Sequence, residues 1–259
     1  MDLSVNGPKI YVQITALKDK AMGLFANPIT QTTVSLLAVT LILIIFSYFL
    51  TKNLDKKKPR GLQIVAEKLV NMLYGLVEDT MGKHNLKFAP YIGTLFLSSI
   101  FGTLLGMTQI FRSVTADLSV TLAWALVTTG LVWYNSIKNF GFKSWLKGFT
   151  EPIVVMTPMN IVSEIAQPLS LAFRHFGNVA GGSVLTTLVY SALAVLSNVI
   201  FGWLPEFILN VFPPVFQVGI PAFLSVYFDL FSGFVQALVF SLLTMVYVGG
   251  ACPPPAEKE

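Results

Sequence analysis

Polar side chains recur along one face of a segment that is otherwise strongly apolar. The segment from Ser163 to Ser183 reads SEIAQPLSLAFRHFGNVAGGS. Its polar residues at successive spacings of four, three, four and four are Ser163, Gln167, Ser170, Arg174 and Asn178. On a helix this spacing places all of them on one face. After Arg174 the next formal charge is Glu206, so the arginine begins an uncharged run long enough to cross a bilayer.

An arginine in such a run is suited to attracting anions and repelling cations. A charge within a membrane helix costs at least about 2.5 kcal/mol even on lenient scales, and it usually marks a functional interior face. Two plainer interpretations remain open, in which Arg174 snorkels to a lipid headgroup or forms a structural pair between helices. Asn178 by itself would indicate only a hydrogen bond between membrane helices.

A second polar face is predicted near the C-terminus. Its residues, at spacings of four, three and four, are Ser225, Asp229, Ser232 and Gln236. They would share one face of the last long apolar helix. Asp229 is the only formal charge between Glu206 and Glu257. Two neighbouring helices would therefore each carry a polar face, one centred on Arg174 and one on Asp229 and Gln236.

Two motifs in this chain resemble those of subunit a of the F-type ATP synthase. The run PLSLAFRHFGNVAGG is similar to the signature helix of that family, which typically reads PLSLSLRLFGN before small residues and an acid. The run FVQALVFSLLTMVYV, from Phe234 to Val248, is similar to the family's second signature. The two motifs stand in the family's order, and the resemblance extends roughly from Thr30 to Ala251.

The resemblance implies an ion-translocating stator subunit in the membrane sector of an ATP synthase. It would lie against a rotating ring of c subunits, each with a membrane carboxylate, beside b-type peripheral stalk subunits and the remaining complex. Two half-channels, one from each side, would end at Arg174, which faces the ring carboxylate and separates them. The ion, H⁺ or Na⁺, would then travel round on the ring, so that its flow drives rotation and ATP synthesis.

The resemblance also implies roles for residues around the arginine. Gln236 would face Arg174 as a neutral partner, and Asn178 would line the same path. Asp229 lies nearer the outside start of its helix and would line the outside half-channel. Glu164 lies near the cytoplasmic start of its helix and would line the inside half-channel.

Two positions depart from the family's pattern. Ser183 stands where the family frequently has an acid, so the acid of this chain is Asp229, on the last helix. The position stays a candidate for the ion path. His175 stands where a leucine is usual, and we interpret it as a packing or hydrogen-bonding residue rather than a relay.

The sequence contains no nucleophile–base pair, phosphate-binding loop or metal-ligand cluster, so we expect no cofactor, no metal and no enzymatic activity of the subunit alone. One alternative is a self-contained ion-coupled secondary transporter that uses Glu164, Arg174 and Asp229 as its binding site. It is disfavoured because only two acids lie near membrane depth and no repeat is visible. A purely structural membrane scaffold is a third interpretation. Reconstitution separates them, because only a transporter moves ions without partners.

Composition supports an integral membrane protein. The 259 residues are 54% hydrophobic and 12% charged, which is about half the charge content of soluble domains. The net charge of +4 comes from basic residues clustered beside apolar runs and does not indicate nucleic-acid binding. The single cysteine, Cys252, rules out an internal disulfide framework, and no cleavable signal peptide is evident.

We expect an all-α integral membrane protein with five transmembrane crossings and one amphipathic surface helix. The expected segments are an N-terminal extracytoplasmic segment (1–28), transmembrane helices (29–51, 88–111, 117–137), basic cytoplasmic loops (52–60, 138–151), an amphipathic membrane-surface helix (61–82), a long helix with Arg174 (152–200), an outside loop (201–214), a long helix with Gln236 (215–251) and a cytoplasmic tail (252–259). The Arg174 helix would measure about 60 Å, twice the hydrocarbon thickness. The last two helices should therefore form a tilted hairpin, with a kink at Pro168.

Loop charges predict the orientation. The expected inside loops 52–60, 83–87 and 138–147 hold five, two and three lysines or arginines, whereas the outside loops near 112 and at 201–216 hold one and none. By the positive-inside rule the N-terminus lies outside and the C-terminus in the cytoplasm. The location is a bacterial-type plasma membrane.

The orientation can be tested by labelling. Single cysteines at Lys57 and Lys143, in a Cys252→Ser background, should react with a membrane-impermeant maleimide only from the cytoplasmic side. Reaction of either position from the outside of intact cells would reverse the assignment.

Overall fold

The structure, a computed structural model, describes residues 10–12, 29–52, 61–108, 111, 113–151, 153–201 and 226–254. Several expected segments lie wholly or mostly outside this part: the N-terminal segment 1–28, the basic loop 52–60, the outside loop 201–214, residues 215–225 with Ser225, and the end of the tail 252–259. The backbone of Asp229 is described, but its side chain is not.

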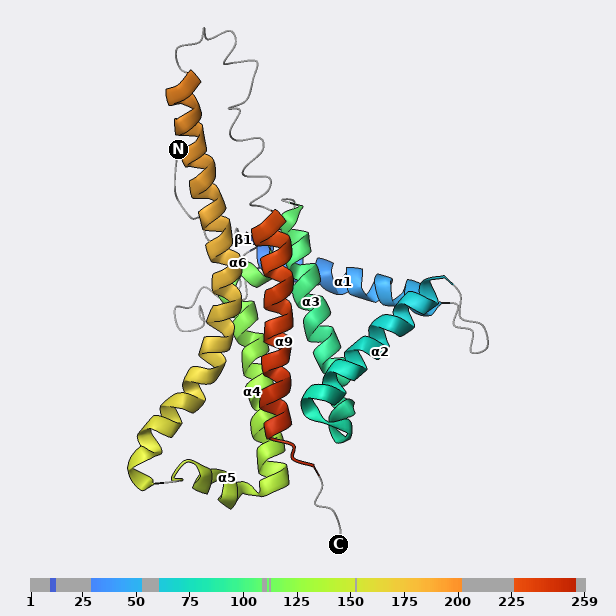
Figure 1. Ribbon diagram of the computed structural model, residues 1–259, viewed down its shortest axis with the longest axis vertical. Coiled ribbons are helices and arrows are strands. Elements are labelled where there is room, and N and C mark those ends of the chain that lie inside the picture. The colour runs from blue at the N-terminus through green and yellow to red at the C-terminus, as the bar shows by residue number, and fades with distance from the viewer. Residues whose placement is uncertain are drawn as a thin grey trace.

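Helices make up nearly all of the described chain (Figure 1). Two short strands, β1 (Ile10–Val12) and β2 (Ile29–Thr30), pair antiparallel before the first helix. The helices, in chain order, are α1 (Gln31–Thr51), α2 (Leu62–Met81), the 3₁₀-helix η1 (Lys83–Phe88), α3 (Ala89–Met107), the 3₁₀-helix η2 (Val114–Ala116), α4 (Leu118–Phe140), α5 (Phe142–Gly148), the 3₁₀-helix η3 (Val154–Met156), α6 (Thr157–Phe201), the π-helix η4 (Val226–Ser232) and α9 (Gly233–Gly250).

Five stretches of the described chain are long and apolar enough to cross a membrane. They are Gln31–Thr51, Lys83–Met107, Leu118–Phe140, Val154–Ser197 and Leu230–Gly250. The predicted all-α membrane fold is thereby confirmed. Between the first two stretches lies α2, in which Val77 and Met81 are buried while Leu62, Val65 and Leu69 are more than half exposed. Its place on a membrane surface stays a prediction.

Helix boundaries differ from the expected ones by a few residues, and one region differs in kind. The expected basic loop 138–151 contains the end of α4 and all of α5. Gly141 separates the two helices, because its φ of 83° lies in the left-handed region and its amide bonds back to the carbonyl of Ile137. A new helical turn then starts at Phe142, so a basic sequence between two membrane helices is not necessarily an irregular loop.

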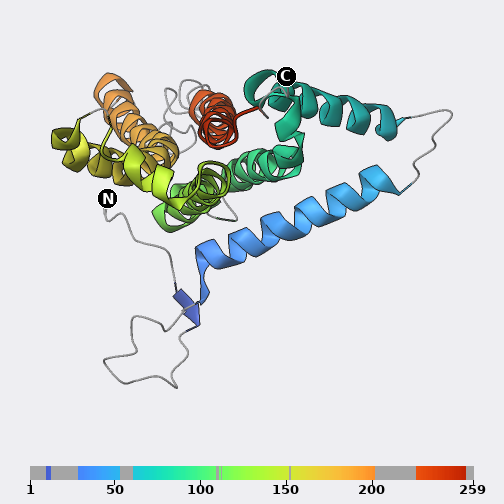
Figure 2. The same ribbon diagram turned by 90° about the horizontal axis from the view of Figure 1, so that it is seen from below.

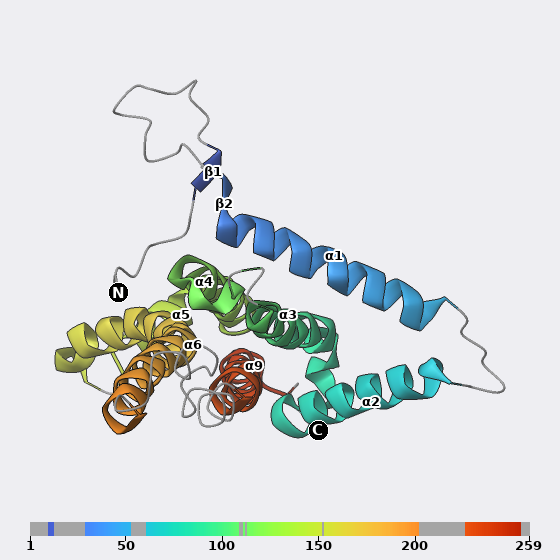
Figure 3. The ribbon, with the colours of Figure 1, turned by 90° about the horizontal axis from the view of Figure 1, so that it is seen from above.

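Four helices form a bundle, and α1 crosses it. Figures 2 and 3 look along α3, α4, α6 and α9 and show α1 lying across their direction. The buried residues of α1, Thr32, Ser35 and Val39, lie in its first half, and Phe46 in its second half meets Phe101 of α3 with ring centroids 5.6 Å apart. Leu37, Leu41 and other apolar side chains of α1 are exposed, which suits a surface that faces lipid.

The longest helix is bent. α6 has 45 residues and would measure about 67 Å at about 1.5 Å per residue. It changes direction between its yellow first part and its orange second part (Figure 1). Pro168 lies inside the helix and removes one backbone hydrogen bond, which accounts for a bend there. A helix of this length crosses about 30 Å of hydrocarbon only if it is strongly inclined.

The centre of the bundle is α9. One group of buried residues joins α9 to α2 and α3 through Val77, Ile92, Met245 and Val248, among others. A second group joins it to α3, α4 and α6 and comprises Leu95, Ala125, Leu171, Ala172 and Phe240. Because α6 contributes only small or medium side chains to this core, most of its surface stays exposed.

Close packing at glycines fixes the C-terminal end of α3. Gly102 and Gly106 form a GxxxG spacing, and the residues that pack against them are Ser113 and the start of η2. A Cβ at Gly106 would lie 2.5 Å from the Cβ and 2.8 Å from the Cα of Ser113. No side chain fits there without a movement of the backbone.

Gly106→Ala should therefore lower the stability of the subunit by about 1–3 kcal/mol through overpacking. Gly130→Ala is the matched control, since a Cβ at Gly130 meets nothing within 4 Å. Thermal inactivation of the purified complex measures the difference. Equal midpoints for the two variants would contradict the packing described here.

Candidate functional site

The two predicted polar faces meet at one hydrogen bond. Nδ2 of Asn178, on α6, donates to Oε1 of Gln236, on α9, over 2.6 Å. Gln236 is only 4% exposed, and its own Nε2 has no partner among the described residues. The buried Gln236 and the exposed Asn178, which sequence spacing placed on separate helices, are thus in contact at the edge of the bundle.

Arg174 lies one helical turn before Asn178, and its side chain is exposed. The two ion pairs among the described residues, Lys83–Glu78 and Lys147–Glu151, lie elsewhere, and Arg174 makes no hydrogen bond within that part of the chain. A guanidinium group carries five N–H donors and stays charged at any relevant pH. Arg174 is therefore available to an acceptor outside the described chain.

His175 points the other way, into the bundle. Its side chain is fully buried, and its Nε2 is hydrogen-bonded to Oγ of Ser99 on α3 at 3.0 Å. The ring stands edge-on to Trp124 of α4 and Phe240 of α9, with centroids 6.1 Å and 5.2 Å apart. The side chain thus packs and bonds, which is the type of contact that we expected of it.

An open cavity of about 470 Å³ lies where α4, α5, α6 and α9 meet. The polar face of α6 begins in this cavity, because Ser163, Glu164 and Gln167 all line it. Glu164 accepts a hydrogen bond from Nε1 of Trp133 on α4. The carboxylate is thus held at the cavity wall, about three helical turns before Arg174.

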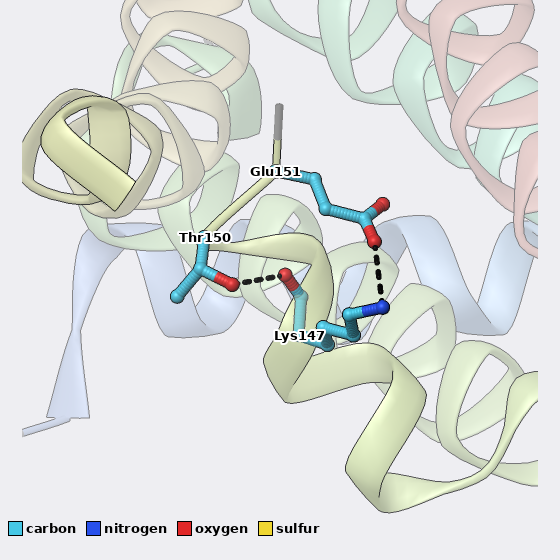
Figure 4. A network of polar contacts seen from close by, with 3 residues as sticks. All are labelled: Lys147, Thr150 and Glu151. Carbon is cyan, nitrogen blue, oxygen red and sulfur yellow. Dashed lines mark hydrogen bonds and ion pairs between the residues drawn. The ribbon is translucent and has the colours of Figure 1, made fainter. Parts of the chain in front are cut away.

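The rim of this cavity is formed by the connection from α5 to α6. Glu151 lines the cavity and is ion-paired with Lys147 at 3.4 Å, while the Thr150 hydroxyl donates to the Lys147 carbonyl (Figure 4). Nδ2 of Asn160 donates to the carbonyls of Phe149 and Glu151 at 2.9 Å and 3.1 Å. These contacts close the end of α5 against the start of α6.

Two further candidate residues are Ser183 on α6 and Asp229, of which only the backbone is described. Ser183 is exposed, and its hydroxyl donates to the carbonyl of Ala180 in the same helix over 2.7 Å. Within the described chain it forms no hydrogen bond with Gln236. Asp229 lies in η4, whose π-helical backbone differs from the α-helical spacing assumed for Asp229 and Gln236. The four–three–four spacing therefore does not establish that these two residues share a face.

Sequence reasoning missed three residues of the site. Trp133, within the expected transmembrane helix 117–137, bonds to Glu164 on α6. Ser99 and Asn160 were not singled out. Each forms its bond with a partner on another element, so no local spacing could have revealed it. Within the described ranges, no group of three or more His, Cys, Asp or Glu residues could hold a metal ion.

These features define a multi-pass helical membrane protein in which an arginine on a polar helix face is exposed and has no ion-pair partner within the described ranges. The family model described as ATP synthase A chain matches residues 32–249 of this chain. The chain therefore belongs to the ATP synthase A chain family, as the motifs at Arg174 and Gln236 predicted.

Individual relatives agree with this assignment. The chain is 34% identical, over 95% of its length and 86% of the relative's, to "ATP synthase subunit a, sodium ion specific" of Propionigenium modestum. It is 32% identical to ATP synthase subunit a of Desulforamulus reducens, over 88% of this chain and 80% of that protein. It is 33% identical to ATP synthase subunit a 1 of Crocosphaera subtropica, over 81% of each. The protein is thus a membrane subunit of an ATP synthase.

The contact between Asn178 and Gln236 can be tested by a double-mutant cycle. Asn178→Ala leaves the buried Gln236 carbonyl without its donor, at a cost of about 1–3 kcal/mol. The double variant Asn178→Ala/Gln236→Ala should be less impaired than the sum of the two single variants. Thermal inactivation of the complex and ATP synthesis in vesicles measure both effects. Thr187→Ala, at an exposed position of the same helix, is the control, and strict additivity would argue against the bond.

Proposed function

We propose that this subunit provides two ion half-channels against a rotating ring of c subunits, with Arg174 separating them. The observation that carries the proposal is that Arg174 is exposed and has no ion-pair partner among the described residues, on a helix that they leave largely uncovered. A ring carboxylate that passes this face would supply the missing anion. Similarity to ATP synthase subunits supports a ring as the partner, with b-type stalk subunits holding the chain in place.

The inside half-channel is the cavity lined by Glu164. Ser163 and Gln167 continue from it along α6 towards Arg174, and the carboxylate of Glu164 gives an ion a polar route into the bundle. Loop charges assign this end to the cytoplasm, since Lys138, Lys143 and Lys147 lie beside it. The N-terminus is then outside and the C-terminus cytoplasmic.

The outside half-channel involves Asp229, with Asn178 and Gln236 at its inner end and Ser183 further along α6. Asp229 is the acid nearest the outside start of its helix. The bond between Asn178 and Gln236 supplies a polar interior surface close to Arg174. An ion entering here would reach a ring carboxylate on the opposite side of Arg174 from the cavity.

The arginine acts through electrostatics. In a low dielectric it attracts a deprotonated carboxylate strongly and repels a cation. Ions therefore cannot pass straight from one half-channel to the other, and each must travel round on the ring. At about 2.3 kcal/mol per charge per 100 mV, several ions must combine to drive one ATP synthesis. The subunit itself would perform no covalent chemistry and would bind no nucleotide.

The coupling ion is H⁺ or Na⁺, and the sodium-specific name of the Propionigenium modestum relative makes Na⁺ a candidate here. The dependence of ATP hydrolysis on Na⁺ concentration in the purified complex distinguishes the two. A chain that moved ions alone in vesicles would instead support a secondary transporter.

Arg174 provides the main test of the proposal. Arg174→Lys keeps a charge but loses the planar fork and the fixed protonation, and it should abolish ATP synthesis driven by an ion gradient. Arg174→Ala should do the same and should also let ions leak passively, because the electrostatic barrier is removed. Ion flux and ATP synthesis in reconstituted vesicles are the measurements.

Lys138→Ala is the matched control, since it also removes a positive charge but at an exposed position near the end of α4. Both Arg174 variants should assemble, because Arg174 contributes nothing to the buried core. An assembled Arg174→Ala complex that makes ATP at the normal rate would overturn the assignment.

A further inference from the structure

His175 is the point at which α6 is joined to three other helices. It bonds to Ser99 of α3, and its ring meets Trp124 of α4 and Phe240 of α9. No part of the side chain reaches the surface. A buried polar ring with a directional bond to one helix and edge contacts to two others permits few orientations.

The partner of His175 is itself held firmly. Ser99 is fully buried, and its carbonyl accepts a hydrogen bond from the hydroxyl of Thr103 over 3.0 Å. The Thr103 hydroxyl is also bonded to that of Thr115 at 3.2 Å, which is bonded to that of Ser113 at 3.0 Å. A chain of buried hydroxyls thus connects the α3 side of the His175 bond to the segment around η2.

The position of His175 determines the direction of Arg174. Successive residues on an α-helix point about 100° apart around its axis. If His175 is fixed towards the centre of the bundle, Arg174 must point out of it, which is what the structure shows. A rotation of α6 by a fraction of a turn would move the guanidinium along or away from the surface that faces the ring.

Few other directional bonds close to Arg174 resist such a rotation. Leu171 and Ala172 are the apolar residues of α6 in the buried core, and both are small or medium in size. Gly177 and Gly181, which follow on the same helix, have no atom within 4 Å of the place a Cβ would occupy. Near Arg174, the directional bonds from α6 to the rest of the bundle are those of His175 and Asn178.

We propose that His175 is a positioning residue: its bond to Ser99 sets the rotation of α6 and so fixes where Arg174 meets the ring. This inference rests on the proposed role of Arg174. Since Nδ1 of His175 has no partner among the described residues, one polar group at the place of Nε2 is enough for this role.

Three variants of the whole complex test the bond. His175→Leu fills a similar space with an apolar side chain that cannot form the bond. His175→Gln keeps a polar group at similar reach. Ser99→Ala removes the bond from the other side. We expect His175→Leu and Ser99→Ala each to lower ion-driven ATP synthesis by roughly tenfold, as misplaced reacting groups do. His175→Gln should retain most of the activity, and the double variant Ser99→Ala/His175→Leu should be no worse than either single one.

A second measurement reports the rotation of α6 directly. Phe173, the other neighbour of Arg174, is 52% exposed, so Phe173→Cys in a Cys252→Ser background gives a thiol on the outer face of α6. Its rate of reaction with a small thiol reagent, in the assembled complex, should change severalfold with His175→Leu and Ser99→Ala but not with His175→Gln. A loss of stability alone would not separate the leucine and glutamine variants in this way.

The outcomes distinguish the two proposals. If Arg174→Ala abolishes ATP synthesis while His175→Leu leaves both the synthesis rate and the thiol reactivity unchanged, His175 has no positioning role. Additive losses in the double variant, or equal losses for leucine and glutamine, lead to the same conclusion. If Arg174→Ala has no effect, the proposed function itself is wrong.

Discussion

A guanidinium group without a fixed anion must be kept in polar surroundings, and this requirement shapes α6. Placing the charge in hydrocarbon costs several kcal/mol, about 2.5 on the most lenient scale. Pairing it with an internal carboxylate would remove the cost but would also neutralise the charge. Among the described residues Arg174 is exposed and makes no ion pair, and the face on which it lies also carries the amides of Gln167 and Asn178.

The remaining helices hold that face in place. α9 lies at the centre of the bundle and offers α6 one polar contact, at Gln236, and one aromatic contact, at Phe240. The apolar side chains that α6 places in the buried core are small or medium in size, and specific contacts at Ser99, Gln236 and Phe240 add to them. The described residues leave one long side of α6 uncovered. A rotating ring of identical subunits would need such a surface to contact.

Local patterns predicted the helices and the polar face of α6, because apolar runs and spacings of three and four depend only on the chain itself. The pairing of Asn178 with Gln236 could also have been predicted, because the sequence identifies both as polar residues on neighbouring apolar helices. The bonds of Trp133 to Glu164 and of Ser99 to His175 were not, because each joins residues 31 or 76 positions apart on elements whose packing the sequence does not specify. The same limit applies to Gly102 and Gly106, because their spacing does not specify that Ser113 and η2 pack against them.

The π-helical turn of η4 affects how this chain is compared with others. A π-turn holds one more residue than an α-turn, so it has the effect of a single-residue insertion absorbed within a continuous helix. Counting a fixed number of residues back from Gln236 therefore identifies equivalent positions only as far as Gly233, where α9 begins. Before that point, a relative whose helix is regular would present its acid on a different side from Asp229. Residues before this turn should be matched to those of a relative by superposing the two backbones. An ungapped sequence alignment would match residues that point in different directions.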